Sequence, residues 1–190
     1  MASSIDASTS GAGGVITTAD NTGILQLKSG GTTIATISST GLALNAGNIT
    51  LPSTAAPAFS AYNNANQTLS TNTTTKIQFN TEVFDTNSNF DSTTNYRFTP
   101  TVAGYYLVSS QIACTSANSS EITIKLYKNG SDYTRLGRLA PTGQTVYFGN
   151  SALVSMNGST DYLEMYVYTA TGFTLEASYS LFSAFLARST

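Results

Sequence analysis

The sequence contains no histidine and a single cysteine, Cys114. A chain without histidine cannot build Ser-His-Asp or Cys-His catalysis, a histidine-ligated zinc site or the usual neutral-pH base. One thiol cannot close an internal disulfide, so packing and oligomerisation must stabilise the fold. No pair of carboxylates stands out among the ten Asp and Glu residues. The sequence therefore predicts a protein that is not an enzyme and needs no cofactor.

Charge is also scarce, because charged residues make up 9% of the chain and the net charge is −2. Lysine and arginine are scattered along the sequence, which argues against nucleic acid and against an anionic membrane surface as partners. No apolar run reaches the roughly 18 residues of a membrane span. The opening "MASSIDASTSGAGG" has neither the basic nor the apolar region of a signal peptide, so we expect synthesis in a cytoplasm.

Helix-forming patterns are missing as well, and Ser, Thr and Asn supply the polarity instead. The segment "GYYLVSSQIAC" alternates in the two-residue period of a half-buried strand. Asn129-Gly130 separates two alternating segments and is the favoured pair for a tight hairpin turn. Several such strands, with turn signals every 8 to 12 residues or so, predict an all-β sandwich or jelly roll.

Composition divides the chain near its prolines. We expect a flexible N-terminal anchor at residues 1–20, a β stalk at 21–52, a linker at 53–57 and a head at 58–190. In the stalk segment, Gly30-Gly31 indicates a hairpin between two of several short strands. Strands this few and short cannot close a core alone, which predicts that the stalk winds around identical copies.

Tyrosines line one face of a predicted strand near the C-terminus. In "STDYLEMYVYTA", Leu163, Met165 and Val167 alternate with polar or aromatic neighbours. Large, flat and amphipathic rings suit a subunit interface better than bare surface. The predicted interface residues are Tyr105, Tyr162, Tyr166 and Tyr168.

The segment "DTNSN", residues 85–89, matches the first five places of a calcium-binding loop. The sixth place requires glycine and holds Phe90, and the twelfth requires glutamate and holds Tyr96. An EF-hand-type site is therefore rejected, and the Asx side chains are expected to satisfy turn backbone instead. The sequence predicts no metal ligands.

The aromatics around that loop resemble the signature of C1q/tumour-necrosis-factor-like globular domains. The matching positions are Phe79, Asp85, Phe90, Phe98, Gly104 and Tyr106. Phe98 comes one residue later than the usual spacing, and Val108 replaces an aromatic. The closing "FSAFLA", with Phe182 and Phe185, resembles the family's last strand.

This resemblance, over about residues 57–190, implies a ten-stranded jelly roll that assembles as a trimer. It implies that the signature aromatics and glycine build the core and the trimer contact, and it leaves open a structural metal ion on the trimer axis. The N-terminal segment "ADNTGILQLKSGGTTIATISSTGLALNAGNITLPS" resembles segments of bacteriophage fibre proteins. Together the two resemblances imply a short fibre with a C1q-like head.

We therefore predict a homotrimeric bacteriophage virion protein, made in the host cytoplasm and located in the virion. Its N-terminus would attach to a capsid, tail or baseplate protein, and its head would contact a host-surface glycan or protein. Loops at 85–95, 115–120 and 140–145 are the candidate receptor loops, with Asn87, Asn89, Asn118 and Thr142. The alternatives are a capsid decoration or head fibre protein and, in another class, a bacterial surface or spore adhesin.

Overall fold

Strand β10 (Gly104–Asn118) shows how alternation builds the larger part of this protein. Tyr106, Val108 and Ile112 are fully buried, whereas Tyr105 on the opposite face is exposed. Successive strand residues point to opposite faces of a sheet, so one strand supplies both core and surface.

The structure is a computed structural model that describes residues 24–29, 31–39, 41–44 and 56–190. Contacts divide the chain into two units, residues 1–50 and 51–190. The predicted anchor and most of the predicted linker lie outside the described residues. Every regular element in the described ranges is a β-strand, which confirms the predicted all-β class. Within those ranges, no helix has the length and hydropathy to cross a membrane.

The N-terminal unit contains an antiparallel three-stranded sheet in the order β1-β2-β3. Its strands are β1 (Leu25–Ser29), β2 (Thr32–Ser38) and β3 (Gly41–Leu44). Ser29 pairs with Thr32, so a tight turn joins the first two strands. Gly31 in this turn has a φ of 80°, a conformation that glycine adopts without steric cost.

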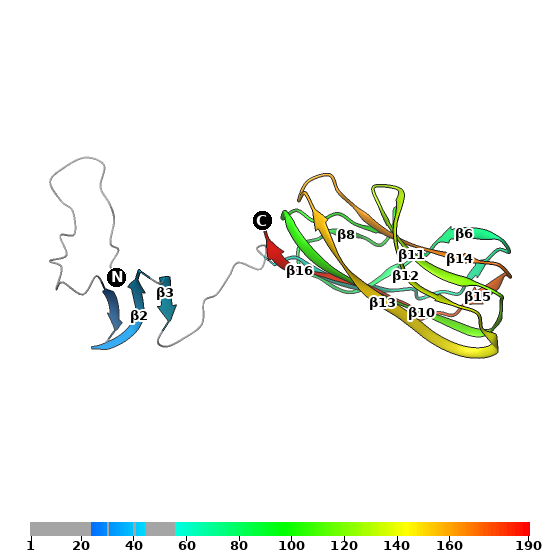
Figure 1. Cartoon of the computed structure of the whole chain (residues 1–190), viewed down its shortest axis with the longest axis horizontal. Helices are drawn as coiled ribbons and strands as arrows, with labels where there is room; N and C mark the ends of the chain where they lie inside the picture. Colours follow the sequence, from blue (N-terminus) through cyan, green and yellow to red (C-terminus); the bar gives the residue numbers. More distant parts are fainter. Residues whose placement is uncertain (1–23, 30, 40, 45–55) are drawn as a thin grey trace. The chain divides into compact units, whose positions relative to one another are not determined.

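The second unit, which we call the head, is a sandwich of two sheets drawn as two layers of strands in Figure 1. The β10 sheet runs β5-β15-β10-β16-β4-β7, and β13 pairs with the other edge of β10; the β14 sheet runs β12-β11-β14-β9-β8, with β6 also paired to β14. All these pairings are antiparallel. The remaining strands are β4 (Ala58–Tyr62), β5 (Gln67–Leu69), β6 (Thr73–Lys76), β7 (Thr81–Asp85), β8 (Phe90–Asp91), β9 (Arg97–Phe98), β11 (Ile122–Lys128), β12 (Ser131–Leu139), β13 (Thr142–Met156), β14 (Leu163–Thr169), β15 (Phe173–Leu175) and β16 (Leu181–Ser189).

Aromatic rings hold the two sheets of the head together. The Phe59 ring of β4 stacks on Phe90 and on Phe98, with ring centroids 4.5 Å apart in both pairs. Phe182 of β16 meets the edge of Phe59 at 5.0 Å. Phe59 and Phe182 belong to the β10 sheet and the other two rings to the β14 sheet, so these contacts cross the sandwich.

The head has two distinct ends. At one end, which we call the near end, the chain enters at Pro57, whose carbonyl accepts a hydrogen bond from the Leu186 amide at 2.9 Å. Figure 1 accordingly shows the C-terminus beside the start of the head. At the opposite, far end, Asn118 of β10 lies across from Thr142 of β13.

We predict that Phe182→Ala lowers the free energy of unfolding by about 3 to 5 kcal/mol, because it leaves a cavity among rings that cannot collapse into it. Urea unfolding followed by circular dichroism measures the change. Tyr133→Ala is the control, because Tyr133 is an exposed aromatic of β12 and its removal should cost under about 1 kcal/mol. Equal losses of unfolding free energy in the two variants would contradict the role of Phe182 in the aromatic core.

Candidate functional site

The aromatic positions of the sequence signature divide between the interior and the surface. Phe79, Phe98, Tyr106 and Phe182 have no exposed surface, and Phe90 is 6% exposed. Tyr106 donates a hydrogen bond from its hydroxyl to the Val102 carbonyl at 2.7 Å, and burial raises the pKa of Tyr106 to about 12. These five rings therefore form core rather than a binding site.

The sixth aromatic residue of the signature, Phe185, is 49% exposed on the outer face of the β10 sheet. It follows Phe182 on the same strand by an odd number of residues, so strand geometry turns the two rings to opposite faces.

Gly104 begins β10 where the chain leaves no room for a side chain. A Cβ there would collide with the Arg188 carbonyl oxygen and would lie 2.6 Å from Leu186 Cδ1. Glycine at this position lets β16 approach β10 closely, which is a structural role at the near end of the head.

The carboxylates of the two aspartates in the loop region accept hydrogen bonds from nearby backbone amides. Asp85 accepts hydrogen bonds from the amides of Asn87 at 3.2 Å and Phe90 at 2.7 Å. Asp91 accepts from the amides of Thr93 at 3.0 Å and Thr94 at 2.9 Å. Among the described residues, no group of three or more His, Cys, Asp or Glu is placed to hold a metal ion.

The predicted receptor residues lie at opposite ends of the head. Asn89 is buried, and its side chain bonds to Thr101 and to the Asn87 carbonyl. Asn87 follows β7 at the near end, where the Thr86 amide donates to the Ala58 carbonyl at 3.0 Å. Asn118 and Thr142 are exposed and pair with each other at the far end, within strands rather than loops. The structure does not bring these four residues together.

The four predicted interface tyrosines also separate. Tyr105 is 43% exposed on the outer face of the β10 sheet. Tyr166 and Tyr168 lie on the outer face of the β14 sheet, where they pair with Lys125 and Thr123 of β11. Tyr162 directly precedes β14. One flat contact surface cannot contain all four, because the sandwich lies between them.

The outer face of the β10 sheet is apolar, and we call it the apolar outer face. Leu107 pairs with Leu153 of β13 on one side and with Phe185 of β16 on the other, so three large apolar side chains form a row across the sheet. Leu153 is 59% exposed. Strands β10, β13 and β16 together contain one charged residue, Arg188. An exposed apolar surface of this kind usually marks a contact with another protein surface.

A hollow of about 320 Å³ opens on the same face. The next row of the sheet places Ser109 between Ser151 and Ser183. Because these three side chains are small, they form the bottom of the hollow. Gln111, Asn150 and Leu181 complete its rim. The lining consists of serine, amide, glycine and leucine residues and carries no charged side chain.

The outer face of the β14 sheet has the opposite chemistry. It holds Lys76, Arg97, Lys125, Arg135 and Arg138, five of the eight basic residues of the chain. The basic residues are scattered in sequence, and the strand pairings bring them together. The sequence signal that could have located them is their position at alternate places of strands, on the side opposite to the buried residues.

The N-terminal sheet also carries an unpaired apolar face. Leu25 pairs with Ile37, Ile37 pairs with Leu42, and Leu27 pairs with Ala35, so these side chains lie on one side of the sheet. The four larger ones, Leu25, Leu27, Ile37 and Leu42, are each exposed. We call them the N-terminal apolar face.

The single cysteine is not a nucleophile. Cys114 is fully buried in β10, and burial raises the pKa of its thiol to about 12. A neutral thiol in the core acts as a small apolar side chain.

Fold and surfaces together define a β-sandwich of the jelly-roll class whose two outer faces differ in chemistry. Residues 58–187 match the C1q domain. The chain belongs to the C1q domain family, as the resemblance of its aromatic signature predicted. No curated protein gave a significant match.

Solved structures share this fold at low sequence identity. The globular domain of zebrafish complement 1qA protein is 17% identical, covers 70% of this chain and 98% of its own, and has a TM-score of 0.55. Murine APRIL is 10% identical with a TM-score of 0.53, covering 69% of this chain and 98% of its own. Eiger TNF from S. frugiperda is 13% identical with a TM-score of 0.50, covering 72% and 94%. These likenesses establish the fold.

The hydrogen bonds to Asp91 make the stability of the head depend on pH. The Thr94 amide, followed by Asn95 and the Thr93 amide, lowers the pKa of Asp91 well below its ordinary value of 3.8. A lowered pKa in the folded state stabilises the fold above the unfolded pKa and is lost as the pH falls toward the folded value.

We predict that Asp91→Asn lowers the unfolding free energy by about 1 kcal/mol at pH 7, and that this difference shrinks below about pH 4. Urea unfolding of both proteins from pH 7 to pH 2.5 measures it. Glu176→Gln, which removes a carboxylate from another loop, is the control and should show no such convergence. A difference that stays constant with pH would refute the role of the Asp91 charge.

Proposed function

We propose that this chain is a homotrimeric bacteriophage virion structural protein, a short fibre that presents its C1q-like head for attachment to the host surface. The observation that carries the proposal is the contrast between the two outer faces of the head. One face is apolar and suited to burial in an assembly, and the other is polar and suited to water and ligand. The protein binds and supports, and it performs no catalysis in this proposal.

The apolar outer face is the proposed contact between head protomers. Leu153 and Phe185 leave much of their surface in water in the single chain, and burying each would contribute about 1.5 to 3 kcal/mol. Tyr105 lies on this face and would join the proposed interface. Tyr162, Tyr166 and Tyr168 lie on the other face, so in this arrangement they stay outside the head contact.

The N-terminal apolar face supports the same assembly. A three-stranded sheet with one apolar side has no core of its own, and two further copies of the same sheet would cover that side. Trimeric heads would hold three such sheets at high effective concentration, which favours their packing. This arrangement is the predicted stalk.

The fibre role rests on the N-terminal resemblance to phage fibre segments together with the exposed apolar faces of the head and of the N-terminal sheet. Residues 1–20 would bind a capsid, tail or baseplate protein. The short chain also fits a capsid decoration or head fibre protein, where the trimer would sit on the shell. A bacterial surface or spore adhesin with the same head is the alternative from another class.

We predict that the purified chain is a trimer by light scattering, and that Leu153→Ser with Phe185→Ser weakens the assembly by about a hundredfold or more. Tyr133→Ser is the control, because Tyr133 is similarly exposed on the other sheet. The double variant should keep its circular dichroism spectrum. A wild-type monomer at micromolar concentration would disprove the proposed interface.

We also predict that fluorescently labelled trimer binds host cells and that antibodies against the head label the fibre tips of intact virions in electron micrographs. Labelling of the capsid shell, with binding to purified capsids and none to cells, would replace attachment by decoration. Absence from the virion would overturn the proposed function as a whole.

A further inference from the structure

Three cross-strand rows organise the outer face of the β14 sheet. In the middle row, Tyr166 pairs with Lys76 on one side and with Lys125 on the other, and Lys125 pairs with Arg135. One flanking row runs Thr74, Tyr168, Thr123 and Arg138, and the other runs Asp91, Arg97, Glu164, Tyr127 and Asp132. We call this surface the basic–aromatic face.

Three of the four carboxylates of this face form ion pairs within it. Glu164 binds Lys76 at 2.5 Å, Asp132 binds Lys125 at 3.0 Å, and Glu121 at the far end binds Arg138 at 3.0 Å. Burial opposes the charge of Lys76, but the hydrogen bond and charge of Glu164 outweigh it and raise the pKa of that lysine. The fourth acid, Asp91, lies across from Arg97 and accepts hydrogen bonds from the backbone amides of its own loop. The five cations of the face therefore outnumber its four acids by one.

Two arginines remain available for a ligand. Among the described residues, neither Arg97 nor Arg135 forms an ion pair with a carboxylate. The Arg97 guanidinium lies 4.4 Å from the centre of the Tyr162 ring, and its cross-strand neighbour Asp91 binds loop backbone instead of the guanidinium. Arg135 is exposed on β12, at the edge of the sheet.

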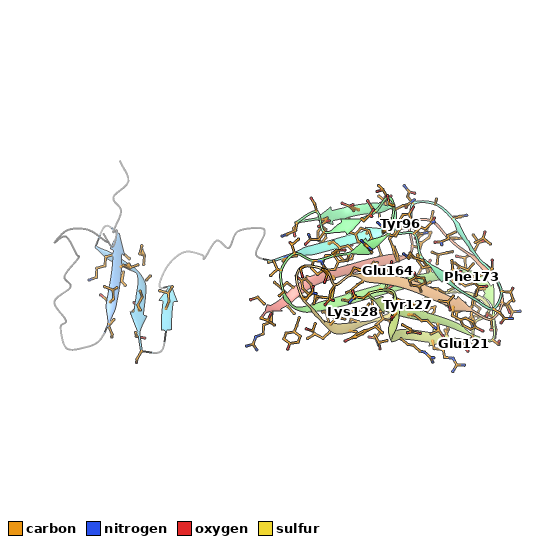
Figure 2. All side chains as sticks on the ribbon, turned by 90° about the horizontal axis from the view of Figure 1, so that it is seen from above. Tyr96, Glu121, Tyr127, Lys128, Glu164 and Phe173 are labelled. Carbon is orange, nitrogen blue, oxygen red and sulfur yellow. The ribbon has the colours of Figure 1, made fainter. Side chains whose placement is uncertain are left out.

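Aromatic rings fill the space between these cations. The centres of the Tyr127 and Tyr166 rings are 4.1 Å apart, and the Lys76 ammonium lies 5.6 Å from the centre of the Tyr166 ring. Figure 2 shows Tyr127 and Glu164 on neighbouring strands of this face, where their backbones pair. Three strand spacings separate the ends of the middle row, about 14 Å.

This combination has the chemistry of a carbohydrate site for acidic sugars. The apolar face of a sugar ring packs on tyrosine, and the tyrosine hydroxyl bonds to sugar hydroxyls. A guanidinium binds a carboxylate in a planar, two-point geometry. A row of this length spans several sugar units, so a chain rather than a single sugar fits it.

We propose that the basic–aromatic face binds a carboxylated polysaccharide of the host surface, with Arg97 and Arg135 as the charged anchors and Tyr127, Tyr166 and Tyr168 as the platform. This deepens the proposed attachment function and rests on it. In the proposed trimer the apolar outer face is buried between protomers, and the basic–aromatic face lies on the other side of each sandwich, free for ligand. Three such faces would add weak contacts into avid binding.

The test is biolayer interferometry of the full-length trimer on immobilised polygalacturonate, dextran and polyglutamate. We expect binding to polygalacturonate that weakens with added salt, and much weaker binding to neutral dextran and to polyglutamate, which lacks sugar rings. Arg97→Gln and Arg135→Gln should each weaken binding about tenfold, and Arg135→Lys less. Lys28→Gln, which removes one positive charge from the N-terminal sheet, is the matched control and should bind as the wild type.

Equal binding to polygalacturonate and dextran, equal binding to polyglutamate, or an equal loss in Lys28→Gln and Arg135→Gln would each overturn the inference. Light scattering and thermal melting of each variant show that a loss of binding is not a loss of assembly. A trimer that binds host cells but not polygalacturonate refutes the acidic ligand and leaves the attachment function intact. Failure to bind cells as well contradicts both.

Discussion

The stack of Phe59 between Phe90 and Phe98 is the contact on which the head depends. It joins a strand of the β10 sheet to two short strands of the β14 sheet, with both centroid distances at 4.5 Å. Offset rings at this distance combine large apolar burial with a favourable mutual geometry. Because the stack fixes how the two sheets face each other, it also fixes which residues point outward on each side.

The two outer faces then acquire different chemistry from the same strand alternation. On the β10 sheet, the row of Leu153, Leu107 and Phe185 lies among uncharged strands, which favours burial against another protomer. On the β14 sheet, the row of Lys76, Tyr166, Lys125 and Arg135 combines three cations with an aromatic ring, and acids pair with the two lysines. The proposed homotrimer with an outward-facing binding surface is built on this division, and the proposed stalk uses the N-terminal apolar face in the same way.

Local sequence patterns were enough to predict much of the fold but little of the arrangement of residues on its surface. The alternation in β10, the turn at Asn129-Gly130 and the signature aromatics depend on residues close in sequence, so the sequence predicted them. Asn129 and Gly130 have φ values of 53° and 77°, as the two central residues of a tight hairpin turn require. The separation of Tyr105 from Tyr166, and of Asn87 from Asn118, could not be predicted, because spacing along the chain does not tell which sheet a strand joins.

The sequence by itself determined an all-β C1q-like head without histidine chemistry, because period and composition act locally. Only the tertiary structure decided that the scattered basic residues share one face. Lys76 and Glu164 are 88 residues apart and meet because β6 pairs with β14, and Arg97 reaches Glu164 because β9 pairs with the same strand. Long-range strand pairing carries that information, and no pattern within a single strand encodes it.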